Sequence, residues 1–234
     1  MDSLFRTPKI SLKTLTDFSQ IDKSTQAHLR KVYTCLGIAM MAAATGAYVH
    51  LFTGLWKGGL LTSIASIGIL IWLAMTPKEN EGKRIGQLSA FALCTGMSLG
   101  PLLNAVINID PSIVVTALMG TVVIFVSLSL CALYTQQRYW LFIGGSLMSM
   151  LSMMLVLSIL NLFLRSAIIF RFEMYFGLFV FCGFVLFDTQ LIIEKKRNGD
   201  NDFVWHSVDL FLDFINIFRH LLVILADKND KRKK

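Results

Sequence analysis

The side chains best suited to chemistry in this sequence are acids and histidines inside its last two hydrophobic stretches. Five polar residues of the last stretch follow one another at steps of 3, 4, 3 and 4: His206, Asp209, Asp213, Asn216 and His220. On a helix this spacing places all five on one face, which we call the polar seam. A further acid, Asp188, lies about 8 Å from the end of the preceding stretch, at 1.5 Å per residue.

Carboxyl groups inside a bilayer predict a specific function, because one isolated acid at the membrane centre costs about 2.5 to 3.5 kcal/mol on insertion scales. Two carboxyl groups that share a site of low dielectric constant cannot both ionise cheaply, so the pair holds a common proton. When that proton leaves, the oxygens become ligands suited to Ca²⁺. We therefore expect a pair of acids in these stretches, such as Asp188 with Asp213, to serve both as a proton sensor and as a transient Ca²⁺ site.

A purely structural role is the alternative for the same acids. They would then bond only to neighbouring hydroxyl groups or to Arg219 and hold the helices together. For Asp209, which lies near the helix end and within reach of His206, the two interpretations are balanced. For Asp188 and Asp213 the energetic cost favours the functional interpretation.

Composition indicates which elements must position these residues. Hydrophobic residues make up 55% of the chain and charged residues 16%, against roughly 25% charged in soluble domains. A membrane span needs about 20 apolar residues, so 234 residues hold about seven. Lipid requires such spans to be helices, which predicts an all-α polytopic membrane bundle. The expected spans are Val32–Phe52, Gly58–Met75, Ile85–Ile107, Ser112–Tyr134, Trp140–Leu164, Glu173–Ile193 and Phe203–Ala226.

The chain divides into a polar segment at residues 1–31, the bundle at 32–226 and a basic tail at 227–234. Basic residues concentrate in the first segment and in the loops after the second, fourth and sixth spans, while the alternate loops hold only Lys57, Arg165 and Arg171. This asymmetry predicts a cytoplasmic N-terminus. The tail does not fit the same pattern, because its five basic residues would lie on the opposite side after seven crossings: Lys228, Lys231, Arg232, Lys233 and Lys234.

Two arrangements of the seventh segment follow from the tail. Either the segment crosses the membrane, or it enters the membrane and returns, so that both termini are cytoplasmic.

Within the bundle, Gly96 and Gly100 form a GxxxG pattern that lets helices approach closely. We expect it to serve internal packing rather than dimerisation, although an oligomer remains open. His28 and His50 stand alone near helix ends, where an ordinary interfacial role is expected.

The last two stretches resemble a known family. The run GFVLFDTQLIIEK at residues 183–195 and the run DLFLDF at 209–214 closely resemble the end of the animal Bax inhibitor proteins in the transmembrane Bax inhibitor motif family. Further resemblance lies at residues 24–26, 46–50, 100–101 and 202–206, and in all it extends from about residue 5 to 226.

The resemblance implies a protein of the endoplasmic reticulum membrane that suppresses apoptosis and stress signalling and lets Ca²⁺ leak out in a pH-dependent way. It assigns the gate to Asp188 and Asp213 by motif. It also implies Bcl-family apoptosis regulators and a stress sensor of the endoplasmic reticulum as partners, and a tail that modulates the leak. Bacterial members carry an arginine in the second helix that can latch one aspartate, but no arginine occurs between Leu51 and Met75 here.

Two other function classes compete with a leak channel. A non-transporting regulator would bind apoptosis and stress proteins through its cytoplasmic surfaces. An intramembrane aspartyl protease also uses two membrane aspartates, but its GxGD signature is absent before Asp188 and Asp213. No zinc, phosphate-loop, serine-nucleophile or dinucleotide motif appears, so we expect no enzyme activity, no cofactor beyond Ca²⁺ as the permeant ion, and no nucleic-acid partner. Membrane lipid is the expected partner of the apolar surface.

Overall fold

A computed structural model of the protein describes residues 22–53, 60–135 and 139–233. Within these ranges the chain forms seven α-helices and one short 3-10 helix, η1. In chain order they are α2 (Lys23–Thr53), α3 (Leu60–Met75), α4 (Glu81–Ile109), α5 (Ser112–Tyr134), η1 (Tyr139–Ile143), α6 (Gly144–Leu164), α7 (Ala167–Arg197) and α8 (Phe203–Lys233). The described ranges contain no strand, so the predicted all-α class is confirmed.

Five segments are long and apolar enough to cross a membrane: α2, α4, α5, α7 and the unit of η1 with α6. The helix α3 is apolar but shorter. The helix α8 has 31 residues and does not reach the same apolar character. These helices support a multi-pass helical membrane bundle, and the count of seven crossings stays a prediction.

One end of the bundle, which we call the Arg84 end, contains the start of α2 and the connections at residues 76–80 and 198–202. Lys78 of the first connection donates a hydrogen bond to Asp200 of the second, with a distance of 3.0 Å. The ammonium group of Lys31 on α2 lies 5.0 Å from the ring centroid of Phe203, where α8 begins. The starts of α2 and α8 therefore lie together.

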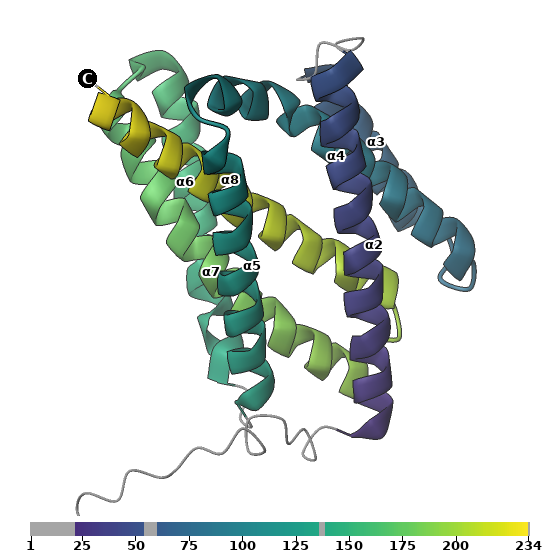
Figure 1. The fold of residues 1–234 in the computed structure, drawn as a ribbon. Helices are drawn as coiled ribbons and strands as arrows, with labels where there is room; N and C mark the ends of the chain where they lie inside the picture. Colours follow the sequence, from purple (N-terminus) through teal and green to yellow (C-terminus); the bar gives the residue numbers. More distant parts are fainter. Residues whose placement is uncertain (1–21, 54–59, 136–138, 234) are drawn as a thin grey trace, which may run out of the picture.

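The opposite end, which we call the Asp110 end, contains the turn between α4 and α5. Asn229, near the end of α8, donates a hydrogen bond of 3.2 Å to Asp110 in that turn. Asp227 lies 3.7 Å from Arg171 at the beginning of α7. Figure 1 shows α8 running between the two ends as one uninterrupted helix. Because α8 is not among the helices apolar enough to cross a membrane by themselves, the choice between crossing and returning stays a prediction.

Small residues allow α2 and α4 to approach closely. A Cβ atom placed on Gly96 would lie 1.9 Å from the carbonyl oxygen of Ala43, and one on Gly46 would lie 2.1 Å from that of Leu93. A Cβ on Gly100 would collide with the ring of His50. Both glycines of the GxxxG pattern thus face α2, as expected for internal packing.

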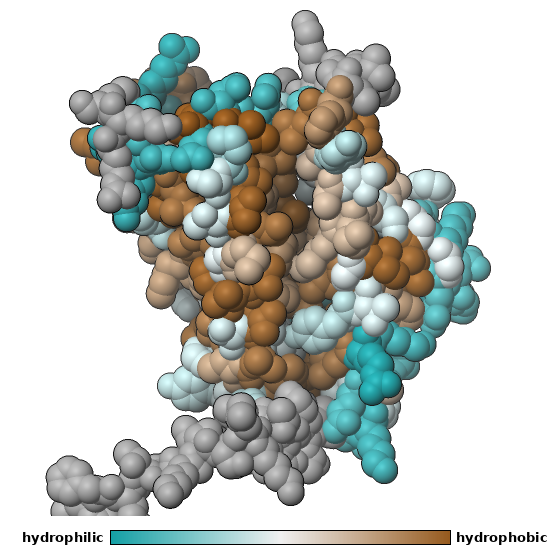
Figure 2. All heavy atoms as spheres, in the orientation of Figure 1, coloured by the Kyte–Doolittle hydropathy of each residue, from teal (hydrophilic) through white to brown (hydrophobic). Residues whose placement is uncertain are grey.

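Apolar residues cover most of the face drawn in Figure 2, and hydrophilic residues gather near its ends. The helix α6 packs mainly on α7, and its other side chains are largely exposed. By contrast, α8 packs against α2, α4, α5 and α7, with Leu210, Phe211 and Ile217 fully buried. The most polar of the long helices is therefore the one most surrounded by protein.

Candidate functional site

The two aspartates that the sequence singled out face each other across the contact between α7 and α8. Asp188 lies on α7 and Asp213 on α8, with their carboxyl groups within hydrogen-bonding reach. The side chain of Asp213 is only 4% exposed, and Asp188 is half-buried. One oxygen of Asp213, Oδ2, has no hydrogen-bond partner among the described residues.

This geometry suits a shared proton. Two carboxylates at hydrogen-bonding distance repel each other in a medium of low dielectric constant, whereas a single proton between them converts repulsion into a hydrogen bond. A cation that acts on Asp188 is Lys195, which lies 3.8 Å from Asp209. Asp209 is half-buried and close enough to influence both members of the pair electrostatically. The site is therefore a pair of acids with a third acid beside it.

The remaining members of the polar seam point to different neighbours. His206 bonds to His28 on α2, with 2.9 Å between the ring nitrogens. Asn216 donates to the carbonyl oxygen of Leu212 in its own helix. His220 bonds to the carbonyl oxygen of Asn216 and packs against the ring of Phe181 on α7. Only Asp209 and Asp213 of the seam thus act on Asp188. Arg219, the predicted structural partner, is exposed.

The residues next to Asp188 tie α7 to two further helices. Thr189 is fully buried, and its hydroxyl lies near those of Tyr33 on α2 and Ser129 on α5, although none of the three has a hydrogen-bond partner among the described residues. Gln190 accepts a hydrogen bond of 2.9 Å from the backbone N–H of Trp140 in η1. Successive residues of a helix point about 100° apart, so three consecutive polar side chains meet three different parts of the bundle. This arrangement fixes the position of Asp188.

A buried ion pair that sequence reasoning missed lies at the Arg84 end. Arg84 at the start of α4 donates to both carboxylate oxygens of Asp202, at 2.6 and 2.9 Å. The two residues are 3% and 7% exposed. Asp202 also accepts a hydrogen bond from the backbone N–H of Trp205, which caps the start of α8. In the sequence, Arg84 counts only as a loop charge, and Asp202 is marked by its position just before a predicted helix and by its place in the family resemblance at residues 202–206.

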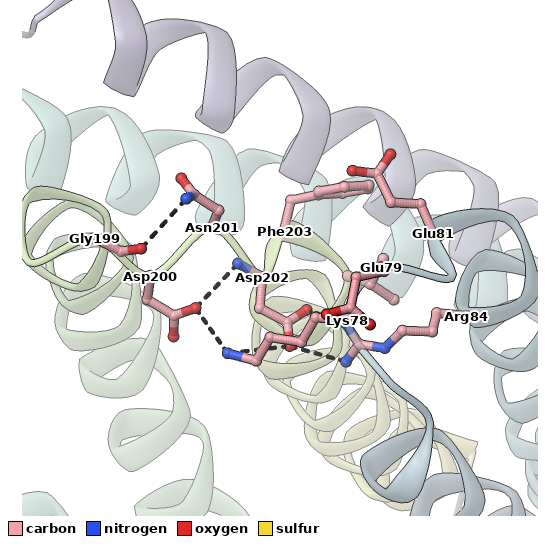
Figure 3. Close-up of a pocket in the computed structure, with 10 residues that line it drawn as sticks. Lys78, Glu79, Glu81, Arg84, Gly199, Asp200, Asn201, Asp202 and Phe203 are labelled. Carbon is pink, nitrogen blue, oxygen red and sulfur yellow. Dashed lines mark hydrogen bonds and ion pairs between the residues drawn. The ribbon is translucent and has the colours of Figure 1, made fainter.

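Lys78 and Asp200 extend this ion pair toward the surface. Figure 3 shows the four charged side chains facing one another around a pocket of about 310 Å³ between the two connections. Burial acts to raise the pKa of Asp202, but the hydrogen bonds from Arg84 and Trp205 outweigh it and hold the pKa below its ordinary value. Burial likewise acts to raise the pKa of Asp200, and its bonds with Lys78 and the backbone of Asp202 lower it. Both acids are therefore anionic at neutral pH.

The expectation for His28 is wrong. This histidine is 5% exposed and hydrogen-bonded to His206, 178 positions away in the chain. A lone histidine near a predicted helix end gives no sign of such a partner. His50 packs against Gly100, and its Nδ1 has no hydrogen-bond partner within the described part of the chain.

The basic tail is the last part of α8 rather than a separate segment, because the helix continues to Lys233. Lys231 bonds to Asp227 one turn earlier. Lys228 lies on the same final turns, whereas Lys234 and the side chains of Arg232 and Lys233 lie outside the described residues. A role of these cations in modulating flux stays a prediction.

Within the described ranges, no group of three or more His, Cys, Asp or Glu side chains is placed to hold a metal ion. Two carboxylates alone offer few ligands compared with the six to eight oxygens that Ca²⁺ takes. A cation at Asp188 and Asp213 would therefore bind transiently, and this also stays a prediction. All four cysteines are free: Cys35, Cys94, Cys131 and Cys182.

Comparison with known proteins gives matches over almost the whole chain. The family model described as "Inhibitor of apoptosis-promoting Bax1" matches residues 25–230. "Probable Bax inhibitor 1" of Paralichthys olivaceus is 56% identical over 227 residues, which cover 96% of this chain and 95% of that protein. "Bax inhibitor 1" of Homo sapiens is 51% identical, covering 97% of each chain. The Arabidopsis thaliana protein of that name is 44% identical, covering 94% of this chain and 90% of that protein.

Proposed function

Because the chain belongs to the family of inhibitors of apoptosis-promoting Bax1, we propose that it suppresses apoptosis and stress signalling from the endoplasmic reticulum membrane. In the same proposal it acts as a passive, pH-dependent Ca²⁺ leak gated by Asp188 and Asp213. The observation that carries the gate is the placement of two carboxyl groups within hydrogen-bonding reach at the contact of α7 and α8.

The gate works through the charge of the pair. With a shared proton, the pair carries one negative charge and its hydrogen bond holds α7 against α8. Loss of that proton leaves two carboxylates facing each other, and their repulsion separates the helices while exposing oxygen ligands to a divalent cation. Asp213 is 4% exposed, so a cation reaches it only after the two helices move apart.

Ca²⁺ flux through purified protein in liposomes, measured from pH 5 to 8, tests this proposal. We expect Asp213→Asn to abolish the pH dependence, because an amide does not titrate and can donate a hydrogen bond to Asp188 at every pH, so no repulsion between two carboxylates develops. The matched control is Asp227→Asn, the same chemical change on the same helix at a half-buried position near the Asp110 end, away from the pair. The gate assignment is wrong if Asp213→Asn keeps both the flux and the pH response of the wild type.

A regulator without transport activity is the second candidate, because the relatives are named for the inhibition of Bax. In that case the chain would bind Bcl-family regulators and a stress sensor of the endoplasmic reticulum. The double variant Asp188→Asn, Asp213→Asn separates the two functions. Full protection of cells by a folded double variant that carries no Ca²⁺ would show that survival does not require the leak.

A further inference from the structure

A second group of titratable residues lies at the Arg84 end, apart from the aspartate pair. The Nε2 atom of His28 on α2 and the Nδ1 atom of His206 on α8 are 2.9 Å apart, and the two rings meet edge to face. Both side chains are buried, and only 1% of His206 is exposed. His206 precedes Asp213 by seven residues, or about 10 Å along the helix.

The number of protons on this pair decides whether the contact can exist. A hydrogen bond between two ring nitrogens needs one nitrogen to donate and the other to accept. The hydrogen bond can therefore form when both rings are neutral and when one ring is protonated. When both rings are protonated, two N–H donors face each other and the hydrogen bond is lost. When His28 and His206 separate into water, each ring can take up a proton at an ordinary histidine pKa of about 6.5. The separated state binds more protons, so acid favours separation.

The charged surroundings do not supply a free counter-ion for a doubly protonated pair. Three positive groups act on it, Lys31 from α2 and Lys195 and Lys196 from α7. Two negative groups act on it from the connection before α8, namely Asp200 and Asp202. Asp202 is engaged by Arg84, and Asp200 by Lys78. Asp200 lies 3.8 Å from Nε2 of His206, near enough to favour the first added proton.

We propose that His28 and His206 form a proton-operated contact that fastens the start of α8 to α2 at neutral pH and releases it in acid. Release leaves the Arg84–Asp202 ion pair to hold that end of α8. The contact is separate from the aspartate gate and does not depend on Ca²⁺ transport. It adds a second pH-responsive element, about 10 Å along α8 from the pair and nearer to the connection between α7 and α8.

Nuclear magnetic resonance of the full chain, labelled with ¹⁵N-histidine in lipid nanodiscs, tests the contact directly. At pH 7.5 we expect a coupling across the hydrogen bond between His28 and His206, and we expect its loss at pH 5. Variants His28→Gln and His206→Gln each remove the coupling. The control His220→Gln retains it, because His220 bonds only to its own helix.

Hydrogen exchange measures the consequence for α8 and remains informative where a coupling is too weak to detect. One extra proton taken up at pH 5 by a group with a pKa of about 6.5 corresponds to a loss of protection of about 30-fold at the start of α8. In His28→Gln, whose amide does not titrate, we expect no such loss after correction for intrinsic exchange. The proposal is overturned by a coupling that persists at pH 5, or by equal losses of protection in the wild type and His28→Gln. Either result stands regardless of whether the protein carries Ca²⁺.

Discussion

Replacing Arg84 by glutamine removes the cation from the buried ion pair that holds the start of α8. Arg84 makes two hydrogen bonds to Asp202, at 2.6 and 2.9 Å, and both residues are more than nine-tenths buried. Glutamine reaches less far and carries no charge, so the carboxylate of Asp202 stays buried without its main partner. An uncompensated buried charge is among the most destabilising consequences of a single substitution.

Breaking a buried ion pair by removing one partner costs about 3 to 5 kcal/mol. Lys78, at 3.8 Å, and the backbone N–H of Trp205 still attract the carboxylate of Asp202 in the variant. We therefore expect the lower part of this range, about 3 kcal/mol, which corresponds to more than about a hundredfold in the unfolding equilibrium.

Reversible unfolding in detergent micelles, followed by circular dichroism, gives the free energy for this comparison. The control Lys78→Gln removes a cation whose side chain is 65% exposed, and exposed pairs contribute about 1 kcal/mol or less. The double variant Arg84→Gln, Asp202→Asn leaves no unpaired charge at this position and keeps a capping side chain, so it should recover part of the loss. Equal stability losses in Arg84→Gln and Lys78→Gln would refute the reasoning.

Three further predictions concern stability. Folding lowers the pKa of Asp202, so its carboxylate contributes to the free energy of unfolding above about pH 4, and this contribution is lost as the pH falls below that value. In Asp202→Asn the free energy of unfolding in micelles should therefore depend less on pH in the acid range. Gly96→Ala should lower the free energy of unfolding by about 1 to 3 kcal/mol, because its Cβ would lie 1.9 Å from a carbonyl oxygen of α2. The control Gly37→Ala places its Cβ where no atom lies within 4 Å, so it should stabilise the protein in the same assay. Tyr33→Phe should leave the melting temperature unchanged or raise it, because the buried hydroxyl of Tyr33 has no hydrogen-bond partner among the described residues, and a clearly lowered value would contradict that geometry.

Hydrophobic runs were sufficient to predict where the helices lie. The expected span Ser112–Tyr134 coincides with α5, and Phe203 was correctly expected to begin α8. The expected span Glu173–Ile193 is shorter than α7, which begins at Ala167 and ends at Arg197. The difference arises because hydropathy marks the apolar part of a helix, whereas backbone hydrogen bonds continue into polar residues beyond it.

Contacts between distant parts of the chain could not be read from the same patterns. Arg84 and Asp202 are 118 positions apart, and each alone is typical of a residue at a membrane surface. The spacing of the polar seam did place Asp213 on one helical face, and burial of charge then predicted a partner inside the bundle. That argument works for acids within an apolar run, but it gives no signal for His28 at the polar start of a helix.

The position of α8 explains how a helix with so many polar groups can form the core of a membrane bundle. Lipid penalises a polar side chain only where the side chain faces lipid or lacks a partner. Around α8 the protein supplies those partners: His28 for His206, Lys195 for Asp209 and Asp188 for Asp213. Because α2, α4, α5 and α7 separate it from the surface that lipid would cover, its sequence is free to carry the charges. The same enclosure makes any added or removed charge on α8 act on helix packing, so both groups of titratable residues can change the structure with pH.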